Sequence, residues 1–195
     1  MKLRSCKGDE RMRLVTIQPY DAWFQLATDG RYTCNIAKSE FFKDENFMKA
    51  YAWMSKEMTR RIGVAPDGIH YPIWCWYKND EDYAHTCKGG REYVKITIDV
   101  DPSRVLLSDF DDWNIALNGG PIVPITTTEE EADAEYDRIV EAGDDAIHET
   151  WARIFRTPEE SAESDYVQGT IWEIRKEDLV EVTLFSTVFR KSESD

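Results

Sequence analysis

Residues 71–77 read Tyr-Pro-Ile-Trp-Cys-Trp-Tyr, and this run constrains the fold more than any other part of the chain. Alternate side chains of a β-strand point to opposite faces of the sheet. Trp74 and Trp76 would then lie on one face and Cys75 on the other, and neither face is suited to contact with water. We expect a strand that is covered on both faces, or a strand whose aromatic face forms the wall of a pocket.

The spacing of apolar residues predicts the remaining elements. Residues 47–62 carry apolar side chains at intervals of three or four, which is typical of one face of an α-helix, and Gly63 would end that helix. Residues 94–100 alternate apolar and polar side chains, which indicates a strand with one buried and one wet face. Further strands are predicted at 14–18, 105–107, 167–174 and 180–188, and further helices at 19–30, 108–117 and 129–155, the last of which residues 143–145 could divide.

This order lacks the strict alternation of strands and helices that a doubly wound fold requires. We therefore expect an α+β fold with a mixed or antiparallel sheet flanked by helices. A length of 195 residues fits one domain. Residues 1–12 are predicted to be a flexible tail, residues 13–190 a single domain and residues 191–195 a frayed tail.

The charge of the chain limits its partners. A net charge of −14 disfavours nucleic acid, because binding to phosphates depends on Lys and Arg. No apolar run reaches the roughly 18–20 residues of a membrane helix, and the N-terminus has no signal-peptide pattern. We expect a soluble, cytoplasmic protein that does not engage a membrane.

Familiar catalytic and metal-binding motifs are absent from the sequence. The three histidines are far apart, and none adjoins a nucleophile motif. The sequence has no glycine-rich phosphate loop. The four cysteines form no Cys-x-x-Cys pair, so no metal site is predicted.

Two acidic segments each have two interpretations. Residues 108–112 (Ser-Asp-Phe-Asp-Asp) lie where a strand gives way to a helix, so Asp109 could contact a ligand or metal, or could simply cap the helix. Residues 129–149 carry ten carboxylates and only one Arg. They form either a docking surface for a basic protein partner or the solvated face of an amphipathic helix.

The aromatic residues also have two interpretations. A flat ligand such as a nucleobase or nicotinamide ring could stack on the side chains of Trp74, Trp76, Tyr77 and Trp113. The alternative is that these residues belong to the core.

Five segments together resemble a bacterial family called domain of unknown function 3841. They read Leu-Val-Thr-Ile-Gln (14–18), Tyr-Pro-Ile-Trp-Cys-Trp-Tyr (71–77), Val-Leu-Leu-Ser-Asp-Phe-Asp (105–111), Trp-Ala-Arg-Ile-Phe (151–155) and Gln-Gly-Thr-Ile-Trp-Glu (168–173). The resemblance implies a bacterial, cytosolic, single-domain protein, and it implies no activity.

A more distant likeness is to NAD-dependent ADP-ribosyltransferases, which hold NAD in a cleft between sheets. The first strand, the helix ending at Gly30 and the late strand 168–173 are similar in order to theirs. The likeness places Thr16 or Gln18 where those enzymes carry His or Arg. It places Tyr71 or Tyr77 where those enzymes carry Tyr or Ser on a middle strand. It places Gln168 or Glu173 where they carry the catalytic Glu on a late strand.

Two hypotheses follow. In the first, an aromatic-lined cleft binds a nucleotide-like small molecule such as NAD, and the protein could act as a divergent ADP-ribosyltransferase. The expected ligand-binding residues are Gln18, Tyr71, Trp74, Trp76, Tyr77 and Asp109, and the expected catalytic residues are Glu173 and Gln168. In the second, the protein is a non-enzymatic module whose acidic helical face meets a basic partner.

Overall fold

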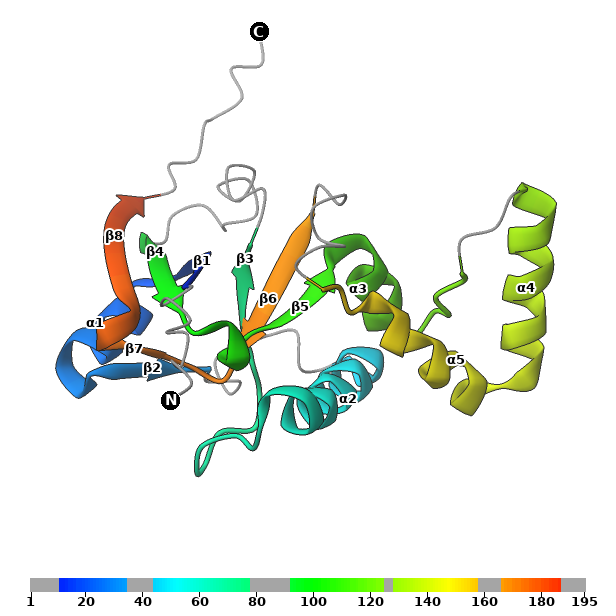
Figure 1. Ribbon diagram of the computed structural model, residues 1–195, viewed down its shortest axis with the longest axis horizontal. Coiled ribbons are helices and arrows are strands. Elements are labelled where there is room, and N and C mark those ends of the chain that lie inside the picture. Colours follow the sequence, from blue (N-terminus) through cyan, green and yellow to red (C-terminus); the bar gives the residue numbers. More distant parts are fainter. Residues whose placement is uncertain (1–10, 35–43, 78–91, 125–127, 158–165, 187–195) are drawn as a thin grey trace, which may run out of the picture.

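The computed structural model describes residues 11–34, 44–77, 92–124, 128–157 and 166–186 (Figure 1). Their strands form a six-stranded sheet and a separate two-stranded sheet, and every strand pair is antiparallel. In spatial order the larger sheet contains β5 (Leu106–Asp109), β6 (Val167–Ile171), β3 (Ile73–Trp76), β1 (Met12–Pro19), β4 (Glu92–Val100) and β8 (Leu179–Ser186), and the smaller one contains β2 (Arg31–Thr33) and β7 (Glu173–Arg175). The fold is α+β, as predicted.

The α-helices of the described chain are α1 (Tyr20–Asp29), α2 (Glu45–Ile62), α3 (Phe110–Leu117), α4 (Glu129–Ala142) and α5 (Asp144–Thr150). Figure 1 shows α1, β2 and β7 at one end of the molecule and α3, α5 and α4 at the other. None of the described helices is long and apolar enough to cross a membrane.

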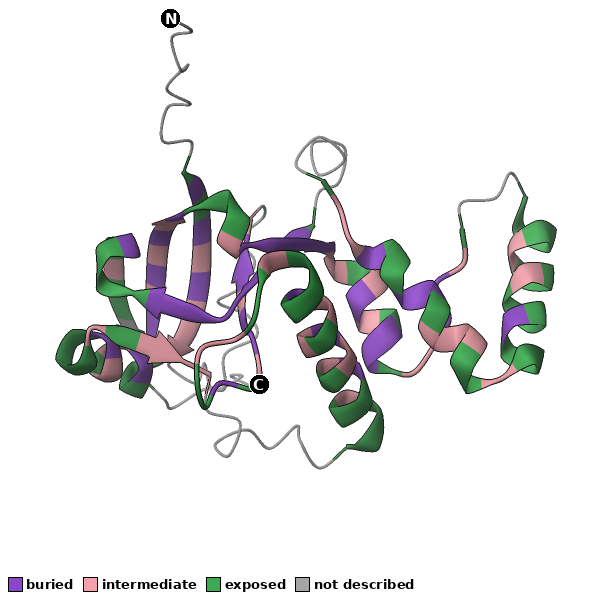
Figure 2. Cartoon of the chain, turned by 60° about the horizontal axis from the view of Figure 1, so that its bottom comes forward, coloured by how far each residue is buried: buried purple, intermediate pink, exposed green. Residues whose placement is uncertain are grey.

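The buried residues, purple in Figure 2, form two separate groups, one on each face of the larger sheet. One face packs Leu14, Cys75 and Ile96 against Leu26 of α1 and Ile174 of β7. The other face, at the β5–β6–β3 end, packs apolar side chains of α2, α3 and the turn after α5. These include Met54, Met58, Trp113, Trp151 and Ile154, and they pack against Leu106 of β5. The aromatic strand β3 is therefore interior and covered on both faces.

Local sequence accounts for the ends of the helices. Asp44 caps α2 by accepting hydrogen bonds from the backbone N–H groups of Asn46 and Phe47. Thr128 caps α4 in the same way. Gly30 ends α1 in the left-handed conformation, with φ of 72°, which glycine adopts without steric cost. Gly143 divides α4 from α5, as residues 143–145 suggested.

The structure differs from the sequence prediction in two strands. Residues 167–174 were expected to form one strand, but Trp172 separates β6 from β7 and the chain passes there into the smaller sheet. The Trp172 indole N–H donates to the carbonyl of Gly63 over 3.0 Å, which fixes this crossing against the end of α2. The partner strand β2 was not predicted, because three residues are too few for a periodicity to be recognised.

The predicted N-terminal and C-terminal tails lie largely outside the described residues. The first strand β1 begins at Met12, whose side chain is buried in the core that faces α1. Arg11 is exposed, and its guanidinium lies 3.7 Å from a carboxylate oxygen of Asp178.

Candidate functional site

Strand β1 is attached very unequally to its two neighbours. It pairs with β4 at every residue from Met12 to Pro19, but with β3 only through Val15 and Trp76. Beyond that pair, the hydroxyl of Thr16 donates to the backbone carbonyl of Trp74 over 2.8 Å. A side chain thus takes the place of the backbone ladder where β1 and β3 separate.

A chain of hydrogen bonds extends from this point to β2. The amide nitrogen of Gln18 donates to the Thr16 hydroxyl at 2.8 Å, and the Tyr32 hydroxyl donates to the Gln18 amide oxygen at 2.9 Å. Thr16 is buried, whereas Gln18 and Tyr32 are half-buried. We call Thr16, Gln18, Tyr32 and the Trp74 carbonyl the Gln18 cluster; it links β1, β2 and β3.

The hydroxyl and thiols around this cluster are uncharged at neutral pH. Burial raises the pKa of Tyr32 far above its usual value, and the negative charge that nearby Cys34 and Cys75 carry once they ionise raises it further. Burial also raises the pKa of Cys34, and that of Cys75 to about 12. Tyr32 therefore remains a hydrogen-bond donor over the physiological pH range.

The predicted aromatic wall lies on the other face of the sheet. Trp76 pairs with Val15, and adjacent residues of β1 alternate between faces, so Thr16 and Gln18 point away from the Trp74 and Trp76 side chains. Trp74 stacks on Trp113 with ring centres 4.6 Å apart. Trp76 is only 6% exposed and contacts Phe110. The predicted residue that shares a face with Gln18 is Tyr77, which packs against the core facing α1.

Tyr71 belongs to a second aromatic group. Its ring centre lies 6.4 Å from that of Tyr51 on α2, and Tyr51 also meets Trp74 and Trp113 edge-on. Burial raises the pKa of Tyr51 to about 12. This group joins α2, β3 and α3 on the face opposite to Gln18.

Neither residue expected to be catalytic meets the Gln18 cluster. Gln168 pairs with Trp76 and with Ser108, so its side chain shares the Trp76 face of the sheet. Glu173 pairs with Thr33 while Tyr32 pairs with Ile174, so Glu173 and Tyr32 point to opposite faces of the smaller sheet. The Glu173 carboxylate instead accepts a 2.6 Å hydrogen bond from Arg175.

Asp109 acts as a helix cap. One of its carboxylate oxygens accepts from the backbone N–H groups of Asp111 and Asp112, at 3.0 and 3.1 Å. Arg156 donates to Asp112 at 2.8 Å and lies 3.7 Å from Asp109. The pKa of Asp112 is raised, chiefly by burial and then by the charge of Asp109. Of the two interpretations of this segment, the capping one describes what Asp109 does.

A small pocket lies between α2 and α5, away from the Gln18 cluster. It encloses about 40 Å³, which is room for about three water molecules and too little for a nucleotide. Its lining residues are Asn46, Lys49, Gly119, Asp144, Ile147, His148 and Trp151. Within the described residues, no three His, Cys, Asp or Glu side chains gather as metal ligands.

Tyr32 was not predicted from the sequence as a residue of the site. The available signal was an aromatic residue between polar Arg31 and Thr33, directly after the helix-ending Gly30. This pattern is typical of a short strand with one buried side chain. Which strand it would pair with, and so which residue its hydroxyl would meet, depends on long-range register.

Comparison with known proteins gives one match. The model of a family described as "Domain of unknown function (DUF3841)" matches residues 13–141, about two thirds of the chain. No curated protein and no solved structure matches the chain.

Proposed function

We propose that this chain, which belongs to the family described as "Domain of unknown function (DUF3841)", binds a nucleotide-like small molecule at the Gln18 cluster. The observation that carries this proposal is a half-buried amide held by two hydrogen bonds where β1 separates from β3. Small-molecule sites commonly combine a few fixed polar groups with apolar and aromatic surroundings. Tyr32 contacts Gln18 directly, and Tyr77 and Trp23 pack against the core on the same face of the sheet and would supply further aromatic surroundings.

The proposal concerns binding rather than group transfer. An ADP-ribosyltransferase step would need a catalytic Glu173 or Gln168 beside the bound ligand. Both side chains point to faces away from the Gln18 cluster. NAD remains the first ligand to test, because it carries a nicotinamide and an adenine, two flat rings that tyrosines can stack on.

A thermal-shift series tests the proposal, with NAD, ADP-ribose and AMP as probes. A ligand present at a hundred times its Kd adds about 2.7 kcal/mol, which raises the Tm of a chain of this size by roughly 5–10 °C. We expect such a rise for at least one probe, and its loss in Gln18→Ala. The matched control is Gln25→Ala, a half-buried glutamine on α1. If no probe shifts the Tm, or if both variants respond alike, the proposal is wrong.

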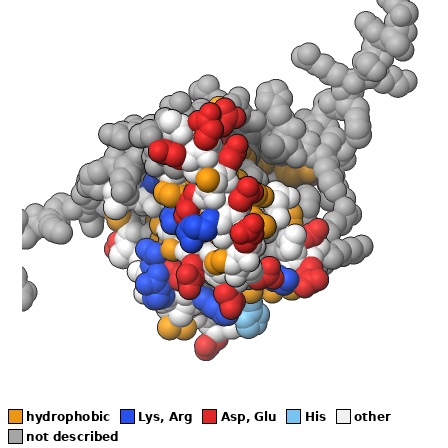
Figure 3. Space-filling view, turned by 90° about the vertical axis from the view of Figure 1, so that its right-hand side faces the viewer, with side chains coloured by type: hydrophobic (Ala, Val, Ile, Leu, Met, Phe, Trp, Pro, Cys, Tyr) orange, Lys and Arg blue, Asp and Glu red, His pale blue; other side chains and the backbone are white. Residues whose placement is uncertain are grey.

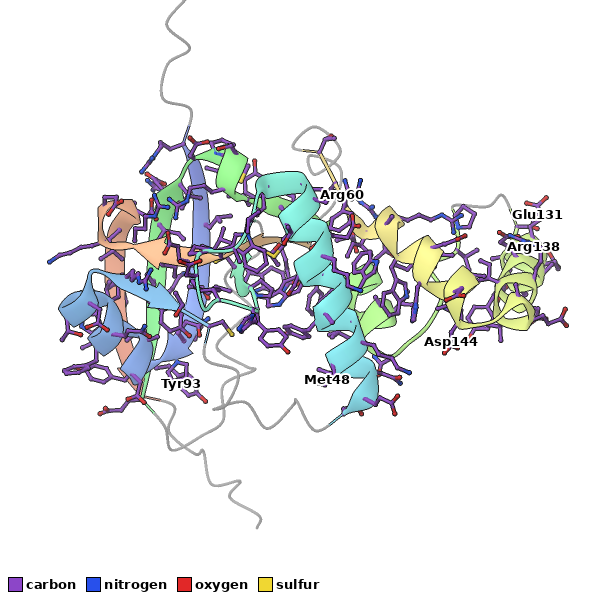
Figure 4. All side chains as sticks on the ribbon, turned by 90° about the horizontal axis from the view of Figure 1, so that it is seen from below. Met48, Arg60, Tyr93, Glu131, Arg138 and Asp144 are labelled. Atoms are coloured by element: carbon purple, nitrogen blue, oxygen red, sulfur yellow. The ribbon has the colours of Figure 1, made fainter. Side chains whose placement is uncertain are left out.

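We propose a second function for the end of the molecule that carries α4: docking of a basic protein partner. Tyr136 and Val140, one helical turn apart, are 47% and 43% exposed. Figure 3 shows acidic side chains over the upper part of this end, and Figure 4 shows Glu131 and Arg138 on α4, far from the strands. Exposed apolar residues with acidic neighbours suit a cationic amphipathic segment.

Fluorescence anisotropy with a synthetic Lys/Leu amphipathic peptide tests the second proposal. We expect binding that weakens with salt and is reduced by Tyr136→Ala together with Val140→Ala. A Glu/Leu peptide of the same length is the control. Equal binding of both peptides, or no effect of the double substitution, would contradict it.

A further inference from the structure

We infer that Gln18 recognises a ligand edge that carries one hydrogen-bond donor beside one acceptor, as adenine and a carboxamide do. The inference rests on the proposed small-molecule site and adds the chemical class of the ligand. It follows from which group donates and which group accepts in each hydrogen bond of the Gln18 cluster.

The Trp74 carbonyl fixes the first direction. A carbonyl oxygen only accepts, so the Thr16 hydroxyl, 2.8 Å away, must donate to it. A hydroxyl has one hydrogen, so Thr16 can only accept from Gln18. The Gln18 atom 2.8 Å from Thr16 is therefore the amide nitrogen, and the amide oxygen faces Tyr32.

The Tyr32 contact fixes the other side of the amide. The Gln18 oxygen can only accept, so Tyr32 donates to it over 2.9 Å. Flipping the amide would leave the Tyr32 contact possible, since that hydroxyl could accept from the nitrogen, but it would place the amide oxygen against a Thr16 hydroxyl that has no hydrogen left to give. One orientation of the amide is thus strongly preferred.

This arrangement leaves one donor and one acceptor position of the amide for a ligand. Among the described contacts, the nitrogen uses one of its two hydrogens and the oxygen one of its two lone pairs. One N–H and one lone pair remain on a half-buried side chain. A glutamine amide pairs in this way with the adjacent donor and acceptor of adenine. A carboxylate lacks the donor, and an ammonium lacks the acceptor.

Two pairs of probes test the inference by isothermal titration calorimetry. NAD is compared with nicotinic acid adenine dinucleotide, and AMP with purine riboside 5′-monophosphate; the second member of each pair lacks the N–H donor at the ring edge. We expect the wild type to prefer the donor-bearing member of one pair by about tenfold, the value of one net hydrogen bond. Gln18→Leu removes the accepting oxygen and should abolish the preference, whereas Gln25→Leu should keep it.

Tyr32→Phe separates a positioning role from a folding role. It removes the donor that holds the Gln18 oxygen, so we expect the preference to fall while the affinity for the donor-lacking probe is unchanged. Circular dichroism and urea unfolding establish that each variant is folded. If both probes of each pair bind equally while Gln18→Ala still weakens binding, this inference is wrong and the proposed site stands. A preference that survives Gln18→Leu also overturns it, and no binding of any probe overturns both.

Discussion

Arg104 donates to both carboxylate oxygens of Asp178, at 2.8 and 3.0 Å, across 74 residues of sequence. Asp178 is 1% exposed and also accepts from the backbone N–H of Arg175. Arg104 reaches further, to the carbonyl of Glu173. This ion pair joins the turn before β5 to the end of β7 and so holds the smaller sheet in place.

Asp178→Asn should lower the free energy of unfolding by about 3 kcal/mol, because it leaves Arg104 without its buried countercharge. Urea unfolding followed by tryptophan fluorescence measures the loss. Asp99→Asn is the matched control, since Asp99 pairs with Arg13 in a comparable two-bond geometry at the surface. The control should lose much less, and equal losses would show that burial does not determine the strength of the Asp178 pair.

Gly169→Ala should destabilise the protein by about 1–3 kcal/mol through overpacking. An added Cβ would lie 2.9 Å from a methyl group of Val105 and 3.3 Å from one of Leu14. Val side chains have little rotamer freedom with which to move aside. Val105→Ala removes the closest methyl group, so the double variant should be more stable than the sum of the two single losses predicts. Simple additivity in urea unfolding would contradict the contact.

Asp112 should titrate above 3.8, the usual value for its side chain, because burial and the charge of Asp109 raise its pKa. The folded state then binds the proton more tightly than the unfolded state. The contribution of Asp112 to stability is therefore present at low pH and is lost as the pH rises through its raised pKa. Carboxyl ¹³C NMR measures the titration directly. Asp109→Asn should lower the pKa of Asp112, while Asp99, whose pKa Arg13 lowers, should not respond.

Cys75 should resist alkylation in the folded protein. Burial raises the pKa of its thiol to about 12, so almost no reactive thiolate is present at pH 8. Iodoacetamide labelling followed by peptide mass spectrometry should modify Cys75 only when urea unfolds the chain. Cys34 is half-buried and provides the internal comparison. Labelling of Cys75 at the same rate with and without urea would mean that β3 is accessible in the folded state.

Sequence patterns predicted most of the secondary structure because that structure is determined locally. The helical spacing of Met54 and Met58 marked the buried face of α2, and the alternation of residues 94–100 marked the buried face of β4. Glycines at 30, 63 and 143 adjoin the ends of helices. Each of these signals involves residues within a few positions of one another, and each was confirmed.

The composition of the site could be predicted only in part, because it depends on strand register. The sequence identified Gln18 as a ligand-binding candidate, and the structure shows its amide fixed by Thr16 and Tyr32. It grouped Gln18 with Trp76, yet the Val15–Trp76 pairing places their side chains on opposite faces. No periodicity within one strand reveals how it aligns with another strand 60 residues away.

The single Val15–Trp76 pair has a mechanical consequence. The six strands consist of two three-stranded ribbons, β5–β6–β3 and β1–β4–β8, that meet along a seam with few backbone hydrogen bonds. Pulling these ribbons apart would separate one paired position, whereas every other pair of neighbouring strands in the described sheet has at least four. Amides along this seam should therefore exchange with solvent sooner than those within either ribbon, and the bonds that close it near Gln18 are made by side chains, which a single substitution can remove.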